Sequence, residues 1–148
     1  MTTTDKDFET FLDTCRKAVA HQVSGRTEVF QSLWSRDDDV VLIGAGGSHQ
    51  KGWHDVSERL SWASQHLNFG GFHVENLMTS VSGDLAFTVD LEHMSREVDG
   101  ETEDRTLRSS QGYRLENGKW RVVFRHGDPM AEDIIPPAQS SQQAARAG

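Results

Sequence analysis

The sequence predicts an α+β domain, because helical patterns fill its first half and strand patterns its second half. Apolar residues recur at helical spacing in residues 5–23, 26–34 and 53–67. After Gly70 and Gly71, short strand-like segments are separated by turn-forming residue pairs. Segregation of helices and strands along a chain is typical of α+β folds. We therefore expect a conical barrel in which three N-terminal helices pack on a curved, mainly antiparallel sheet.

The first predicted helix, residues 5–23, carries an apolar stripe. The stripe consists of Phe8, Phe11, Leu12, Cys15, Ala18 and Val19. Ser24 and Gly25 interrupt the pattern before the shorter second helix. Because Cys15, the single cysteine, lies within the stripe, we interpret it as a buried, inert thiol rather than a nucleophile.

Strands are predicted on both sides of the third helix. Val40–Ile43 is a continuous apolar run, as expected of a short buried strand. The glycine-rich residues 44–47 follow it without the Gly-Lys-Ser/Thr of a phosphate-binding loop, so we expect a flexible turn there. The remaining strands are predicted over residues 72–78, 85–94, 105–115 and 120–128.

The composition fits a single domain over residues 1–131, followed by a polar tail. We expect the tail, residues 132–148, to be disordered, because it lacks a way to bury apolar surface. The net charge of −8 argues against nucleic-acid binding. No apolar run is long enough to span a membrane, and the first residues lack a signal peptide's apolar region. With a lone cysteine, these features predict a cytoplasmic protein without membrane partners.

The pair Asn117-Gly118 predicts a two-residue hairpin turn, which sets a register for the last two strands. Counting outward from this turn places His126 opposite Ser109. The predicted interior face consists of Leu107, Ser109, Gln111, Tyr113, Leu115, Trp120, Val122, Phe124, His126 and Asp128. This face is apolar near the turn and polar at its far end, which suits the floor of a pocket.

The opposite face of the same hairpin carries four arginines, Arg108, Arg114, Arg121 and Arg125. Four guanidinium groups cannot share a core without partners. We therefore expect this face to be solvated, or paired with carboxylates from a neighbouring strand or a second subunit. The arginines favour a homodimer joined through the outer face of the sheet.

The preceding strand leaves two alternatives for a third polar group in the pocket. If Asp99-Gly100 is a two-residue loop, Asp90 and Glu92 share the interior face. If a bulge intervenes, His93 and the apolar residues of that strand point inward instead. Turn chemistry favours Glu92, and the apolar pattern favours His93.

His126 and Asp128 are the candidate proton-transfer pair. A carboxylate in an apolar cavity has a raised pKa, and a nearby imidazole could hold or exchange its proton. The alternative is that Asp128 caps a loop and His126 satisfies a backbone group. The spacing does not require a metal site, so we predict neither a metal nor a cofactor. Residues expected to line the pocket are Trp34, Trp53, Glu92, His93, Ser109, Gln111, Tyr113 and Phe124, although the two tryptophans also fit the core.

Four segments, together with the element order, resemble the SnoaL-like branch of the nuclear transport factor 2-like superfamily, which includes ketosteroid isomerases and polyketide cyclases. The segments are Leu33–Val40, Gly52–Val56, Gly83–Ala86 and Trp120–Asp128. The resemblance covers roughly residues 8 to 129 and implies a pocket between helices and sheet and, usually, a homodimer. In the cyclases an acidic residue on a late strand is the general acid/base, and Asp128 is the nearest match. The isomerases' tyrosine lies on the first helix, whereas Tyr113 lies on a strand.

Two functions remain open from the sequence. The first is a small-molecule-binding domain of the SnoaL-like type that need not be catalytic, with a small apolar or carbonyl-containing ligand. The second is a cofactor-free isomerase, cyclase or dehydratase in which Asp128 is the acid or base and His126 orients it.

Overall fold

The computed structural model describes residues 3–130, with side chains from Asp7 onward, so the predicted tail lies outside the described residues. The elements in chain order are α1 (Thr3–Val23), α2 (Glu28–Ser32), β1 (Val41–Ile43), β2 (His49–Lys51), α3 (Trp53–Gln65), β3 (Gly71–Ser82), β4 (Leu85–Val98), β5 (Glu101–Glu116) and β6 (Lys119–Pro129). Among these described residues, no helix is both long and apolar enough to cross a membrane.

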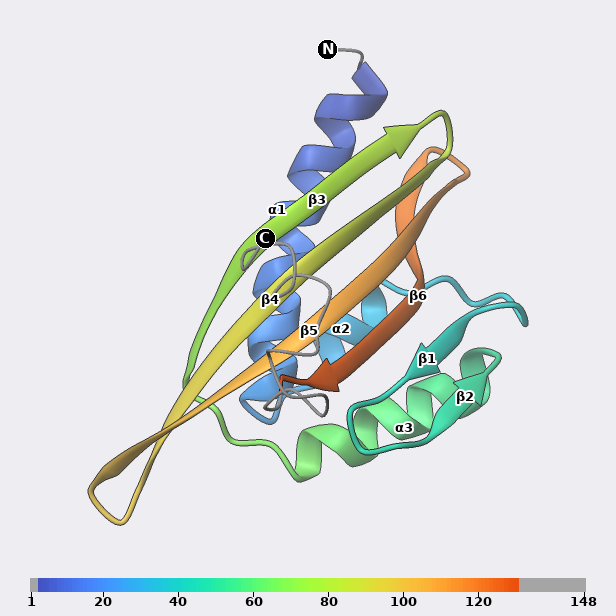
Figure 1. The fold of residues 1–148 in the computed structure, drawn as a ribbon. Helices are drawn as coiled ribbons and strands as arrows, with labels where there is room; N and C mark the ends of the chain where they lie inside the picture. Colours follow the sequence, from blue (N-terminus) through green and yellow to red (C-terminus); the bar gives the residue numbers. More distant parts are fainter. Residues whose placement is uncertain (1–2, 131–148) are drawn as a thin grey trace, which may run out of the picture.

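The strands form one curved sheet in the order β2-β1-β6-β5-β4-β3 (Figure 1). Neighbouring strands are antiparallel except for β1 and β6, which run parallel. The edge strands β2 and β3 do not pair with each other, so the sheet is not closed. The three helices pack against this sheet, which confirms the predicted α+β class.

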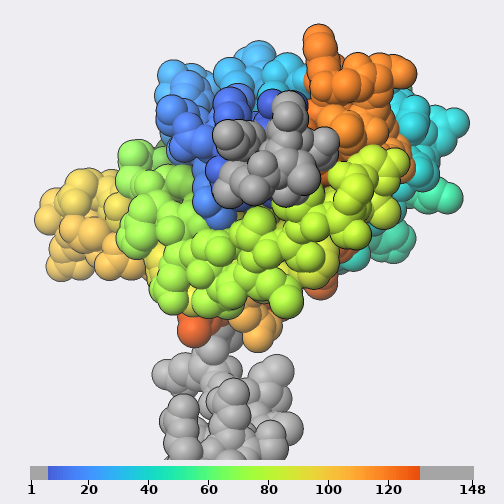
Figure 2. Space-filling model, turned by 90° about the horizontal axis from the view of Figure 1, so that it is seen from above, coloured from blue at the N-terminus to red at the C-terminus, as the bar shows by residue number. Residues whose placement is uncertain are grey.

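Two features of the sheet differ from the sequence-based prediction. The glycine-rich turn leads into β2, a short strand that the polar residues His49–Lys51 did not indicate. Strands β4 and β5 are also longer than predicted, with 14 and 16 residues. Their far ends form a two-stranded ribbon that projects beyond the body of the domain (Figures 1 and 2).

The core lies between α1 and the inner face of the sheet. Phe8 of α1 packs edge-on against Tyr113 of β5 and Trp120 of β6, with ring centroids 5.1 and 5.0 Å apart. Cys15 is fully buried in the same layer. The predicted apolar stripe of the first helix therefore faces the sheet, and the prediction of a buried thiol is confirmed.

A bulge in β6 changes the predicted register. Both central residues of the Asn117-Gly118 turn have positive φ, as a type I′ turn requires. The register follows that turn as far as Tyr113, which pairs with Val122, but Gly112 then pairs with Phe124, so Val123 has no partner. One extra residue moves every later side chain to the opposite face.

The turn between β4 and β5 decides the alternative left open by the sequence. Asp99 and Gly100 both have positive φ, and Val98 pairs directly with Glu101, so the loop has two residues. Glu92 consequently faces the interior and is 3% exposed. The alternative based on turn chemistry is correct.

Candidate functional site

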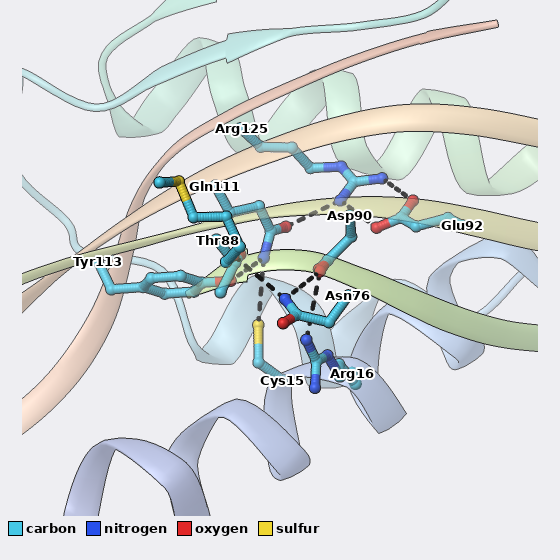
Figure 3. Close-up of polar contacts among 10 residues, drawn as sticks. Cys15, Arg16, Asn76, Thr88, Asp90, Glu92, Gln111, Tyr113 and Arg125 are labelled. Carbon is cyan, nitrogen blue, oxygen red and sulfur yellow. Dashed lines mark hydrogen bonds and ion pairs between the residues drawn. The ribbon is translucent and has the colours of Figure 1, made fainter. Parts of the chain in front are cut away.

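A buried ion pair crosses the inner face of the sheet. Arg125 of β6 donates hydrogen bonds of 2.6 and 2.9 Å to the two carboxylate oxygens of Glu92 on β4 (Figure 3). A third bond of 2.8 Å runs from Arg125 to the side-chain oxygen of Gln111 on β5. Burial opposes the charge of Arg125, but the charge and hydrogen bonds of Glu92 outweigh it and raise the pKa of the guanidinium.

The network continues from Gln111 toward the aromatic core. The side-chain amide of Gln111 donates a hydrogen bond of 2.7 Å to the hydroxyl of Tyr113. That hydroxyl shares a second hydrogen bond, of 2.8 Å, with Thr88 of β4. The same amide lies 3.7 Å from the sulfur of Cys15. Burial raises the pKa of Cys15 to about 12 and also raises that of Tyr113, so both groups are neutral near pH 7.

A second charged pair lies where the network approaches solvent. Asp90 of β4 accepts a hydrogen bond of 3.3 Å from Arg16 of α1 and one of 2.7 Å from Asn76 of β3 (Figure 3). The side chain of Arg16 is 33% exposed, whereas that of Asp90 is 7% exposed. Burial raises the pKa of Asp90, and its hydrogen bonds from Asn76 and Arg16 oppose this only in part. Asp90 is therefore the interior carboxyl best suited to hold a proton.

The structure places only some of the predicted pocket residues on the inner face. Glu92, Ser109, Gln111 and Tyr113 are buried there. Trp34 is 1% exposed and packs in the core against Phe30, whose ring centroid lies 5.9 Å away. Trp53, at the start of α3, is half-buried beneath the guanidinium of Arg36.

The predicted inward placement of His126 and Asp128 is wrong. The bulge at Val123 turns both side chains to the outer face, where Asp128 forms a forked ion pair with Arg108 at 2.6 and 3.1 Å. The hydrogen bonds from Arg108 are the largest cause of the lowered pKa of Asp128, and the charge of Arg108 lowers it further. The geometry therefore gives no support to the catalytic role predicted for the two residues.

Phe124 and His93 are also on the outer face. Phe124 lies opposite Gly112 in the register. His93 contacts Thr106 at 3.0 Å and Glu75 at 3.3 Å, away from the interior network. Their predicted placement in the pocket is therefore wrong: the bulge at Val123 turns Phe124 outward, and the two-residue Asp99-Gly100 turn puts His93 on the outer face.

Sequence reasoning missed Arg125 as the central interior group. Counting from the turn without a bulge put Arg125 on one face with three other arginines, whereas the bulge puts it on the same face as Glu92. The demand of four adjacent arginines for carboxylates was the available signal. Two of the other three arginines pair with carboxylates of their own chain: Arg108 with Asp128, and Arg114 with Asp37, Asp39 and Glu116. Arg121 donates a hydrogen bond to the carbonyl of Ser32 instead.

One group of possible metal ligands occurs on the surface of α3. The donor atoms of His54, Asp55 and Glu58 all lie within 4.8 Å of one another, and all three residues are exposed. Exposed groups of this kind are usually solvated, and the group is separate from the interior network.

The part of the outer face formed by β3 and β4 carries an apolar surface that the described residues leave uncovered. On β3 and β4, Met78, Leu85 and Phe87 are 52, 55 and 44% exposed. Val89, Leu91 and Phe124 extend this surface and are half-buried. An antiparallel sheet with one solvated face normally carries polar residues there, so this face has the character of an interface.

Comparison with solved structures places this geometry among known folds. A proposed dehydratase of the nuclear transport factor 2-like family from Streptomyces avermitilis has a TM-score of 0.70 at 19% identity, covering 86% of this chain and 99% of that chain. A ketosteroid isomerase-like protein from Erwinia carotovora atroseptica has a TM-score of 0.71 at 15% identity, with coverages of 88% and 99%. A proposed calcium/calmodulin-dependent protein kinase type II association domain from Thiobacillus denitrificans has a TM-score of 0.69 at 22% identity, with coverages of 83% and 94%.

These identities establish a shared fold and leave activity open. No curated protein matches the sequence. The family match is more specific, because the SnoaL-like domain family matches residues 12–132, most of the chain. The fold, the helix-to-sheet interior and this match agree with one another, and the chain belongs to the SnoaL-like domain family.

Proposed function

We propose that this chain binds a small carbonyl-containing molecule in its polar interior and need not catalyse a reaction. The observation that carries the proposal is the buried pair of Glu92 and Arg125. Removing two charges from water costs several kcal/mol each, and apolar replacement of such a pair is often neutral or stabilising. A domain that needed only a stable core would not require this pair, which supports a role in recognition.

The donors of the network suit a carbonyl or carboxylate oxygen. Arg125 and Gln111 present N–H groups in the interior, and the half-exposed Arg16 offers a route for a ligand between α1 and the sheet. A ligand oxygen would compete with Glu92 for Arg125, or with Asp90 for Arg16. Forked guanidinium contacts of this kind fix orientation as well as adding affinity.

Ligand-observed NMR with a panel of small ketones, amides and carboxylates tests the proposal. We expect the wild-type protein to bind a subset, and the double variant Glu92→Met/Arg125→Met to lose that subset while remaining folded. The matched control is Arg108→Gln/Asp128→Asn, which removes a forked pair between β5 and β6 on the outer face and should bind as the wild type does. Equal binding by wild type and the interior variant would refute the proposal, as would no binding at all.

A catalytic alternative is favoured by Asp90. Burial raises the pKa of Asp90, as a general acid or base working near neutral pH requires, and Asn76 and Arg16 orient it. The measurement is proton exchange at the α-carbon of a bound ketone, which deuterium incorporation from heavy water reports. Exchange that persists undiminished in Asp90→Asn would contradict this role.

We also propose a homodimer joined through the outer face of the sheet. The exposed row of Met78, Leu85 and Phe87 supports it, and structures named as association domains are among those with this fold. Light scattering should give a dimer at low and high salt, because the attraction is apolar and the outer arginines have partners within the chain. Phe87→Asp should give a monomer, whereas Val98→Asp, at the exposed ribbon tip, should not. A wild-type monomer at micromolar concentration would exclude the dimer.

A further inference from the structure

A cleft of about 550 Å³ lies between the segment that follows α2 and the turn joining β5 to β6. Its two walls are fixed against each other by backbone hydrogen bonds of 2.9 Å, from Val122 to Leu33 and from Ser35 to Val122. The volume is within the usual range for small-molecule pockets. The cleft shares no lining residue with the interior network.

The acidic residues of the cleft share one arginine that lies outside it. Asp37 and Glu116 both line it, and both pair with Arg114, at 3.1 and 2.7 Å. Arg114 lies outside the lining and also pairs with Asp39 at 2.9 Å. These carboxylates are therefore engaged on one side of the cleft and do not supply partners to its basic residues.

The basic residues of the cleft, Arg36, Lys119 and Arg121, have no carboxylate partner among the described residues. Arg36 donates a hydrogen bond of 3.0 Å to the carbonyl of Gln31, and Arg121 donates one of 2.9 Å to the carbonyl of Ser32. Each guanidinium has five N–H donors, so several remain unused.

The two guanidinium groups are held in place near each other. Both are anchored by carbonyls at the C-terminal end of α2, and Arg36 also stacks over the ring of Trp53 at 3.9 Å. Partial burial, followed by the like charge of Arg121, lowers the pKa of Arg36. An arrangement that keeps cations together at this cost, in a chain with a net charge of −8, favours an anion between them.

We propose that this cleft binds a small molecule carrying several anionic oxygens, either a phosphate ester or a polycarboxylate. Arg36 and Arg121 would contact the oxyanion through their free N–H groups, and Lys119 would add a third positive charge. The indole N–H of Trp34, which lines the cleft, is buried and has no partner within the described part of the chain. The proposal goes beyond ligand binding in the interior, because it uses different residues.

An NMR titration of the full chain tests this site, with inorganic pyrophosphate and citrate as probes at ionic strength matched with sodium chloride. We expect shifts at the indole N–H groups of Trp34 and Trp53 and at backbone amides of residues 35–37 and 117–121. A response to pyrophosphate alone identifies the phosphate class, and a response to citrate alone identifies the carboxylate class.

Variants separate a built site from general charge. Arg36→Gln/Arg121→Gln should weaken binding at least tenfold, and Arg36→Lys/Arg121→Lys should weaken it less, because charge remains but the fork is lost. The charge-matched control Lys17→Gln/Arg26→Gln, which leaves the cleft intact, should bind as the wild type does. Retained core resonances show that each variant is folded. The interior variant Glu92→Met/Arg125→Met should bind both probes normally.

Absence of any shift with both probes would overturn the proposal, since the two guanidinium groups would then only cap α2. Equal weakening in the control variant would overturn it as well, because binding would then depend on net charge.

Discussion

Arg125 on β6 reaches across β5 to Glu92 on β4 and holds both of its carboxylate oxygens, at 2.6 and 2.9 Å. Arg125 is 8% exposed and Glu92 is 3% exposed, so neither charge is solvated. The pair ties together three neighbouring strands at the middle of the helix–sheet interior. Its energetic consequence depends on whether one partner or both are replaced.

Replacement of one partner should be far more damaging than replacement of both. Arg125→Met or Glu92→Met alone leaves a buried charge unpaired and should cost about 3–5 kcal/mol of unfolding free energy. The double variant should recover most of this loss. Urea unfolding of the four proteins gives the coupling directly. Additive losses in the double variant would show that the pair is not energetically coupled.

Deletion of Val123 should leave the later part of β6 in its present register. Without the bulged residue, Phe124 follows Val122 directly and still lies opposite Gly112, so Arg125 stays inside and His126 and Asp128 stay outside. The comparison is Val123→Ala, which keeps the bulge and should cost about 1 kcal/mol, because Val123 is partly buried. Circular dichroism and urea unfolding measure both variants. A deletion variant that does not fold would contradict this register.

Cys15 should resist thiol reagents until the protein unfolds. Its side chain is fully buried, and burial raises its pKa to about 12, so the reactive thiolate is scarce at neutral pH. Labelling with an aromatic disulfide reagent should proceed at the rate of unfolding in native buffer and quickly in concentrated urea. Fast labelling of the native protein would mean that α1 opens from the sheet.

The pH dependence of stability should carry opposite signatures of Asp90 and Asp128. Burial raises the pKa of Asp90, so the native state holds this proton more tightly than the unfolded chain, and stability falls as pH rises from about 4 through the native pKa. Asp90→Asn removes this effect and should therefore gain stability relative to the wild type as pH rises above about 4.

Asp128 provides the comparison for that experiment. Its pKa is lowered by Arg108, so it contributes stability that is present above the ordinary aspartate pKa and lost as pH falls through the lowered value. Asp128→Asn should lose stability relative to the wild type as pH rises toward about 4, below the range in which Asp90→Asn gains, and by less than about 1 kcal/mol, because the pair is exposed. Parallel pH curves for the two variants would contradict both assignments.

Local sequence determined the helices, the turns and the order of the elements. Helical periodicity located α1 and α3, and the pairs Asp99-Gly100 and Asn117-Gly118 specified two-residue turns, because each places both residues at positive φ. These features depend on neighbours within a few residues. They were sufficient to predict the α+β class and to place Ser109, Gln111 and Tyr113 on the inner face, with Glu92 there in one of two alternatives.

Tertiary structure alone decided which polar groups enter the interior. In β6, adjacent residues of similar β propensity allow a regular strand or a bulge at Val123, and the sequence of that strand does not distinguish them. The bulged register puts Arg125 against Glu92 of β4, which lies 33 residues earlier, and leaves His126 and Asp128 outside with Arg108. The interior therefore follows from a long-range ion pair, whose partners local periodicity cannot reveal.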